Sequence, residues 1–149
     1  MTQRTTDGDC PYCRIATGDD DPPLRVKCDD ALVAAPPADH QLSKGHVVVF
    51  FAPAHVETFA SLNPDVAAGL SRAAHFAATV MDEQFGASDV TILCGRETTE
   101  SGHVHFDVVP RYPDDGLDLV SAPEYETDRY AANYAQMAEA FAAVRGDDD

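Results

Sequence analysis

Hydrophobic and polar residues alternate strictly over residues 103–109. One side of this stretch holds two histidines, an aspartate and a valine: His103, His105, Asp107 and Val109. The other side is apolar and holds Val104, Phe106 and Val108. A period of two with β-branched and aromatic residues predicts a half-buried strand, entered through Gly102 and ended by Pro110. One face of this strand should belong to the core, while the other presents two imidazoles and a carboxylate.

Four further stretches predict strands, at residues 25–28, 31–35, 47–51 and 89–94, and Asp29 with Asp30 joins the first two as a hairpin. Asn63 and Pro64 are typical of a helix start, and Gly86 of its end. A second helix is expected from about residue 128 to 145. Strands in a meander, with helices between and after them, predict an α+β domain: an antiparallel sheet of about five strands with two main helices on one face. The histidines should then point to the uncovered face.

The length of 149 residues is typical of one domain. We expect a flexible N-terminus over residues 1–9, a single domain over residues 10–146 and an acidic tail over residues 147–149. No apolar run approaches the roughly 18 residues of a membrane span, and the first residues have no apolar core of the signal-peptide kind. These features predict a cytoplasmic protein without membrane contact.

Charge is the unusual global feature, with 26 acidic against 10 basic residues and a net charge of −16. Such a chain repels nucleic-acid phosphates and anionic membranes, so we expect neither as a partner. We interpret the acidity as adaptation to a salt-rich cytosol. Strong screening in that environment lets an anionic phosphate substrate approach an acidic protein.

Cys10-Pro11-Tyr12-Cys13 is the first motif with chemistry. A Cys-x-x-Cys pair in an intracellular chain is half of a metal site or a redox pair. A redox motif usually follows a strand, and none is predicted here, so zinc is favoured. His55, on a loop just past a predicted strand, is a candidate ligand or an ordinary exposed histidine. His103 and His105 could serve a metal, a nucleophile with its helper, or a polar strand face.

Taken together, the ordered motifs resemble those of the histidine-triad (HIT) superfamily. They are Cys10-x-x-Cys13, Lys44-Gly45-His46 before a strand, Pro53-x-His55 after it, and His103-x-His105-x-Asp107-x-x-Pro110-Arg111. The resemblance runs from about residue 10 to about residue 112. It implies a nucleotide-binding hydrolase or transferase, usually a homodimer whose sheets join. Such enzymes act on nucleoside phosphoramidates or dinucleoside polyphosphates through a nucleotidyl-histidine intermediate.

The resemblance also implies residue roles. In zinc-containing members, the positions matching Cys10, Cys13, His55 and His103 hold the metal, and His105 matches the nucleophile. A Cys₂His₂ set suits a structural zinc ion. Residues two apart on a strand are about 6.6 Å apart, so His103 can bind zinc while His105 stays free. A rival iron site of His103, His105 and Asp107 is disfavoured, because its ends lie about 13 Å apart along the strand.

Three departures from the family pattern bear on activity. Asp107 stands where the third histidine of the triad is expected, and an ionised carboxylate cannot donate a hydrogen bond to phosphate. It would also attract a proton to His105 and penalise the neutral nucleophile. The usual phosphate loop is altered, leaving Thr98, Thr99 and Ser101 as candidate phosphate donors. The acidic stretch that binds ribose in the family is replaced, which leaves Asp39 as the candidate for that role.

Two classes of function remain open at this point. One is a nucleotidyl hydrolase or transferase that uses His105, with Asp107 in the catalytic set. The other is a zinc-stabilised nucleotide-binding or regulatory module with weak or lost catalysis. The retained His-x-His motif favours the first, whereas Asp107 and the altered loop favour the second.

Overall fold

The computed structural model describes residues 8–94, 102–119 and 133–145. The chain divides into two compact units, Met1–Gly116 and Leu117–Asp149, and each is described by itself. The second unit contains helix α3 (Asn133–Arg145), within the range expected for the second main helix. That this helix covers the sheet, and that residues 10–146 form one domain, stay predictions.

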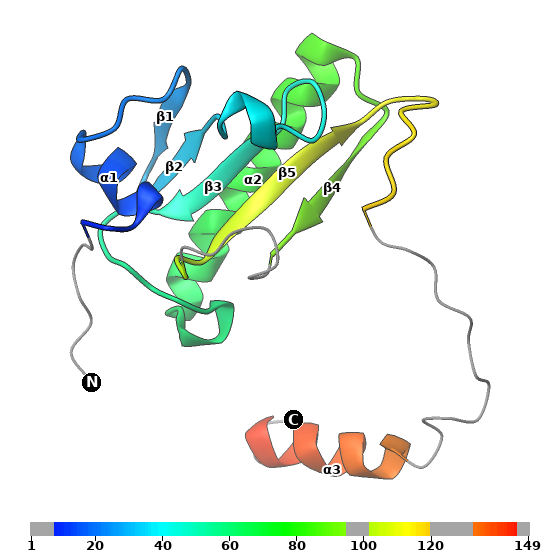
Figure 1. The fold of residues 1–149 in the computed structure, drawn as a ribbon. Coiled ribbons are helices and arrows are strands. Elements are labelled where there is room, and N and C mark those ends of the chain that lie inside the picture. The colour runs from blue at the N-terminus through cyan, green and yellow to red at the C-terminus, as the bar shows by residue number, and fades with distance from the viewer. Residues whose placement is uncertain (1–7, 95–101, 120–132, 146–149) are drawn as a thin grey trace. The chain divides into compact units, whose positions relative to one another are not determined.

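The first unit is built on a five-stranded antiparallel sheet of order β1-β2-β3-β5-β4 (Figure 1). The strands are β1 (Arg25–Cys28), β2 (Ala31–Ala34), β3 (Val47–Phe51), β4 (Asp89–Leu93) and β5 (His105–Arg111). Asp29, with φ of 54°, turns the chain between β1 and β2. The α+β class and the five-stranded antiparallel sheet are therefore confirmed.

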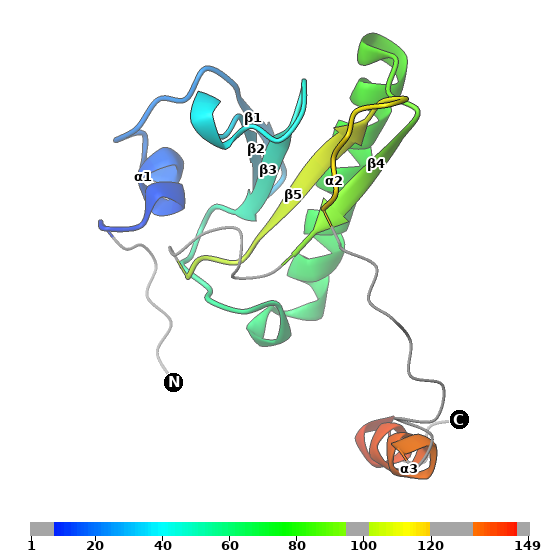
Figure 2. The same cartoon turned by 45° about the vertical axis from the view of Figure 1, so that its right-hand side comes forward.

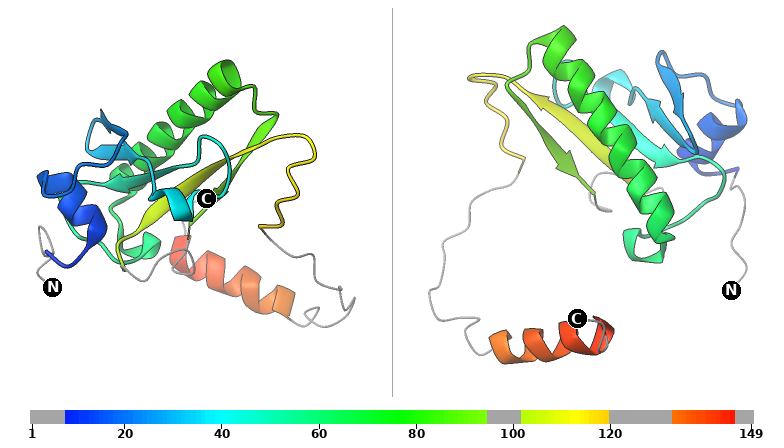
Figure 3. Two further views of the ribbon diagram at one scale, coloured as in Figure 1. Left: turned by 45° about the horizontal axis from the view of Figure 1, so that its top comes forward. Right: turned by 180° about the vertical axis from the view of Figure 1, so that it is seen from behind.

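Helix α2 (Pro64–Phe85) packs across one face of the sheet, as the two views of Figure 3 show. Its start follows the sequence signal, because the Asn63 side chain accepts a hydrogen bond from the Asp65 amide at 2.8 Å. Gly86, with φ of 69°, ends it in the left-handed conformation that glycine adopts without strain. The buried face of α2 consists of Leu70, Ala73, Ala74, Ala77 and Met81.

Helix α1 (Pro11–Thr17) lies against the opposite face of the sheet, away from α2 (Figure 2). This helix packs on an apolar cluster separate from the one between the sheet and α2. The cluster consists of Leu32, Ala34, Val48 and Phe50, and the helix contributes Tyr12, Ile15 and Ala16. The expectation of an uncovered face behind the histidines is therefore wrong. His105 and Asp107 are 2% and 4% exposed, so β5 is buried on both faces rather than half-buried.

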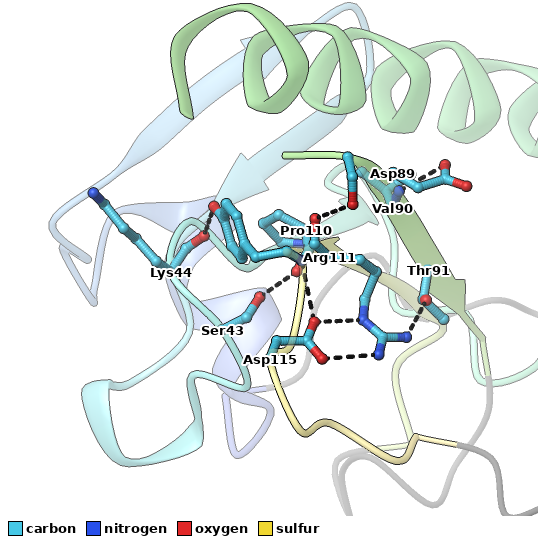
Figure 4. A network of polar contacts seen from close by, with 10 residues as sticks. Ser43, Lys44, Asp89, Val90, Thr91, Pro110, Arg111 and Asp115 are labelled. Carbon is cyan, nitrogen blue, oxygen red and sulfur yellow. Dashed lines mark hydrogen bonds and ion pairs between the residues drawn. The ribbon is translucent and has the colours of Figure 1, made fainter. Parts of the chain in front are cut away.

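Both ends of β5 also differ from the prediction. The strand begins at His105, because the Val104 amide pairs with the Val56 carbonyl at 2.7 Å, beyond the end of β3. At the other end the strand continues through Pro110. Its carbonyl accepts the Ser43 hydroxyl at 2.7 Å (Figure 4). The N–H and C=O of one strand residue point to the same side, so the missing N–H of Pro110 faces the segment that precedes the first residue of β3.

Arg111 fixes the far end of β5. Its guanidinium donates to Asp115 at 2.9 and 3.2 Å and to the Thr91 hydroxyl of β4 at 3.1 Å (Figure 4). Two 3₁₀ turns, η1 (Ala38–His40) and η2 (Phe59–Ser61), connect the main elements. In the part of the chain that is described, no helix is long and apolar enough to cross a membrane.

Candidate functional site

Four potential metal ligands meet at one end of β5. The donor atoms of Cys10, Cys13, His55 and His103 lie within 4.8 Å of one another. Nδ1 of His103 is 3.5 Å from both sulfur atoms, and Nδ1 of His55 is 3.4 Å from the Cys13 sulfur. A tetrahedral zinc ion, with bonds of about 2.3 Å to sulfur and about 2.0 Å to nitrogen, separates its ligands by roughly 3.3 to 3.8 Å. The four residues therefore fit a metal ion of this kind.

Local structure explains how distant residues reach this cluster. Cys10 is the N-cap of α1, Pro11 occupies the first helical position, and one helical turn brings Cys13 to the same side. His55 follows the end of β3, and His103 precedes β5. Because β3 and β5 are antiparallel neighbours, the end of one lies beside the start of the other. The cluster thus joins the N-terminal segment to the middle of the sheet.

The ring of His103 is oriented by a second contact. Its Nε2–H donates to the Phe51 carbonyl at 3.0 Å, which leaves Nδ1 to face the two thiols. Burial lowers the pKa of His103 to about 4; the Phe51 carbonyl opposes this shift, and His55 and His105 add to it. His103 is therefore held as the neutral imidazole, which is the form that binds a metal.

His105 lies next along the same face of the strand. Its Nδ1 is 3.0 Å from the His103 carbonyl, and since a carbonyl only accepts, Nδ1 carries a proton. The Tyr12 ring stacks on the imidazole, with centroids 4.8 Å apart and planes at 24°. The remaining nitrogen, Nε2, faces Asp107.

Asp107 lies between two histidines. Its Oδ1 accepts a hydrogen bond from His46 Nε2–H at 2.9 Å, and its Oδ2 is 3.2 Å from His105 Nε2. The second contact is short but poorly aligned, and buried Oδ2 has no well-formed hydrogen bond. Burial raises the pKa of Asp107, but the contacts with His105 and His46 outweigh it and hold the pKa well below its usual range.

The side chains of His105 and Asp107 approach to 3.2 Å, although their backbone positions are about 6.6 Å apart along the strand. With Nδ1 of His105 protonated, a bare Nε2 and an ionised Oδ2 would repel each other at 3.2 Å. The pair is attractive only when a proton lies between the two atoms. His105 and Asp107 therefore act as one unit that shares a proton, more tightly coupled than their spacing alone predicts.

An open pocket of about 1150 Å³ reaches this unit from one side. Tyr12, His46 and Asp107 line it together with apolar residues such as Ile15, Pro36, Leu42 and Val48. Asp39 is at the rim, where its carboxylate lies 3.4 Å from His40. Within residues 8–94 and 102–119, no lysine or arginine lines the pocket. The predicted phosphate donors Thr98, Thr99 and Ser101 lie outside the described residues.

Two residues of the site were missed by reasoning from sequence as parts of it. From sequence, His46 is only part of the Lys44-Gly45-His46 motif, and Tyr12 is only a residue between two cysteines. The pairing of β3 with β5, which sets Val48 opposite Asp107, brings His46 to Asp107. The available signal is a histidine directly before a strand of this kind. The cluster of metal-ligand atoms does not include His105 or Asp107, so the rival iron site has no support among the described residues.

No protein-family model and no curated protein matches this sequence. Solved structures do match its fold. A HIT family protein from Bacillus anthracis has a TM-score of 0.78 at 21% identity, covering 93% of this chain and 99% of its own. A Zn-bound histidine triad family protein from Mycobacterium smegmatis has a TM-score of 0.64 at 23% identity, with 88% and 96% covered. A histidine triad nucleotide-binding protein from Candida albicans has a TM-score of 0.72 at 16% identity, with 91% and 99% covered. The chain therefore has the fold of the histidine-triad superfamily, as the order of its motifs implied.

Proposed function

We propose that this protein is a nucleotide hydrolase or nucleotidyl transferase that uses His105 as its nucleophile. Its substrates are nucleoside phosphoramidates or dinucleoside polyphosphates, bound in the pocket that Tyr12, His46 and Asp107 line. The observation that carries the proposal is the anchoring of His105. The His103 carbonyl holds Nδ1–H at 3.0 Å, so that Nε2 is the nitrogen able to attack phosphorus.

The shared proton gives Asp107 a role in each half of the reaction. In the first step the shared proton moves from Nε2 of His105 to Asp107, Nε2 bonds to phosphorus, and the bond to the leaving group breaks. Asp107 gives its proton to the leaving amine or oxygen. In the second step Asp107 takes a proton from water, whose oxygen bonds to phosphorus as the P–Nε2 bond breaks. The His105–Asp107 pair then has its proton again.

The experiment is an intact-mass measurement after mixing the protein with an adenosine 5′-phosphoramidate. We expect an acid-labile adduct with the mass of one adenylyl group, absent in His105→Ala. An adduct that forms equally in His105→Ala would refute the nucleophile assignment. If the wild-type protein binds AMP in calorimetry but forms no adduct and releases no product, the proposal that it is an enzyme is refuted.

A second function is favoured by a specific observation. Asp107 Oδ2 lies 3.2 Å from the nitrogen that must attack, and His105 is 2% exposed beneath Tyr12. A site of this kind can hold a nucleotide without transferring it. The alternative is a zinc-stabilised nucleotide-binding or regulatory module, for which AMP binding without adduct formation is the expected result.

We also propose that the ion bound by Cys10, Cys13, His55 and His103 is a structural Zn²⁺. Three sulfur-to-nitrogen distances of 3.4 to 3.5 Å and the neutral His103 support this assignment, as does the Zn-bound neighbour with the same fold. A closed Cys₂His₂ set leaves no coordination position for substrate, so the ion would supply folding energy rather than chemistry. The residues would fasten α1, and with it Tyr12, to the start of β5.

We further propose a cytoplasmic homodimer joined through β4. Strand β4 pairs with β5 on one side, and Ile92 is 49% exposed. An open strand edge pairs readily with a second copy. Sedimentation velocity in molar KCl should give twice the chain mass of 16.0 kDa, and monomers at micromolar concentration would contradict the dimer.

A further inference from the structure

His46 is a buried histidine whose hydrogen bonds define its protonation. Only 2% of it is exposed, at the end of the loop that leads into β3. The Leu42 amide donates to its Nδ1 at 3.0 Å, so Nδ1 has no proton. Nε2 therefore carries the proton and donates it to Asp107 Oδ1 at 2.9 Å. His46 is a neutral donor in a single tautomer.

The backbone before β3 holds the ring in this place. Gly45 has φ of 93°, and the His46 amide closes a turn on the Ser43 carbonyl at 3.1 Å. His46 and Val48 lie two residues apart, and Val48 is directly opposite Asp107 in the sheet. Side chains at this diagonal offset on neighbouring strands share a face and can touch.

A single hydrogen bond to Oδ1 decides where the other oxygen points. Without it, the carboxylate could rotate about its terminal bond and offer either oxygen, or neither, to His105. With it, Oδ2 stays 3.2 Å from His105 Nε2. We propose that His46 is a positioning residue, which acts through Asp107 to hold Oδ2 of the carboxylate beside Nε2 of His105. This inference rests on the proposed function for its kinetic consequence, but not for its geometry.

The contact from Leu42 connects the pocket to this chain of hydrogen bonds. Residues 38–42 form one wall of the pocket, and the last of them donates to His46. A rival explanation is that His46 only stabilises the loop between residues 42 and 46. The two explanations differ in which ring nitrogen matters, because Nδ1 serves the loop and Nε2 serves Asp107.

Two substitutions separate these roles. In His46→Gln the amide nitrogen can reach the place of Nε2 and donate to Asp107, whereas in His46→Asn the shorter amide can replace only Nδ1. Removing a supporting residue of this kind typically lowers activity by about 10- to 100-fold. We expect His46→Asn to lower kcat for adenosine phosphoramidate by that factor with KM little changed. We expect the kcat of His46→Gln to stay within about threefold of the wild-type value, which is a smaller loss than the 10-fold minimum expected when the supporting contact is removed.

The matched control is His75→Gln on the exposed side of α2, which should leave kcat and KM unchanged. Unfolding curves for all variants show whether the fold survives. If His46→Asn is as fast as the wild type, or if His46→Gln is as slow as His46→Asn, the positioning role is refuted.

A measurement without substrate tests the geometry by itself. Nitrogen-15 NMR of the ligand-free wild type should show His46 with an unprotonated Nδ1 and a protonated Nε2. The carbon-13 signal of the Asp107 carboxylate should move in His46→Asn and stay near its wild-type position in His46→Gln. A His46 protonated on Nδ1 would refute the inference. A wild type that forms no adduct refutes the proposed function instead, and these spectra still decide the role of His46.

Discussion

Asp107 is the residue at which this site departs most from a set of three histidines. Its carboxylate is 4% exposed and touches His46 and His105. Burial works against its charge, and the two imidazoles more than compensate, so its pKa is lowered. An amide at this position can accept from His46 and donate to His105 Nε2 but has no proton to transfer. A third histidine can donate to phosphate without placing a negative charge beside it.

Substitutions at Asp107 should therefore separate stability from activity. We expect Asp107→Asn to remain folded but to form the nucleotidyl adduct about 100-fold more slowly or worse, the usual contribution of general acid–base catalysis. We expect Asp107→His to form it faster than the wild type at neutral pH. Rates come from intact-mass time courses, with unfolding curves as the control. If both variants are strongly slowed while folded, Asp107 is a specialised acid rather than a weakened triad member.

The lowered pKa of His103 gives a stability prediction for the metal-free protein. Between the ordinary pKa of about 6.5 and the folded value of about 4, the unfolded chain binds a proton that the folded chain does not. The stabilisation is complete above pH 6.5 and is lost as the pH falls toward 4, by about 3 kcal/mol. Urea unfolding of chelator-treated protein at several pH values measures it. His103→Gln should lack this part of the slope, and an equal slope in both proteins would contradict the prediction.

At the scale of elements, we expect α1 to depend on the proposed metal site and on its apolar contacts with the sheet more than on its own helix propensity. The helix has only seven residues, shorter than the roughly 12 that an isolated helix needs. Both thiols lie at its start, and its Tyr12 covers His105. Losing the ion should therefore loosen α1 and uncover His105.

Metal analysis of protein purified without chelator should give one zinc ion per chain, as the four-ligand cluster requires. Cys13→Ser should lose the ion and lower Tm, whereas Cys94→Ser, an exposed cysteine outside the cluster, should keep both. In the wild type, diethyl pyrocarbonate should modify His105 faster after chelation. Metal-free protein with readily alkylated Cys10 and Cys13 would refute the assignment.

The elements that the sequence predicts well are those with local signals. Helix α2 has its cap, its proline and its terminal glycine within one segment, and its observed start and end agree with the prediction. The burial of β5 is not predicted from its own sequence, because Tyr12 of α1, nearly a hundred residues earlier, stacks on His105, and His46 contacts Asp107. The His46–Asp107 contact needed the register of two strands, which alternation in one strand does not contain. The spacing of Cys10 and Cys13 indicates half of a zinc site by itself, whereas the full four-ligand set follows only from the resemblance of the motif order to a known superfamily.

At the scale of the whole molecule, the acidic surface opposes the proposed chemistry. The net charge is −16, and within the described residues the pocket is lined by carboxylates and no lysine or arginine. An anionic nucleotide therefore meets repulsion on approach and again near Asp107. Salt reduces the long-range part, because the Debye length falls from about 10 Å at 0.1 M to about 3 Å at 1 M. Repulsion between buried Asp107 and a phosphate bound beside it would be screened much less, so salt should affect nucleotide association more than the chemical step.

The same screening should act on the fold. Like charges on the surface repel one another in the compact state, and unfolding moves them apart, so dilute buffer should favour the unfolded chain. We expect Tm to rise clearly from dilute buffer to molar KCl. The control is the double variant Asp82→Asn and Glu83→Gln, on the exposed side of α2 and away from the pocket, which reduces the net negative charge from −16 to −14. This variant should be more stable than the wild type in dilute buffer and gain less from salt, with the two melting curves converging in molar KCl. Two outcomes would contradict this prediction: a Tm that is flat or falls with KCl, or a variant whose Tm rises with KCl as much as that of the wild type. In either case salt does not act by relieving self-repulsion. The acidic composition would then have another cause than adaptation to a salt-rich cytosol.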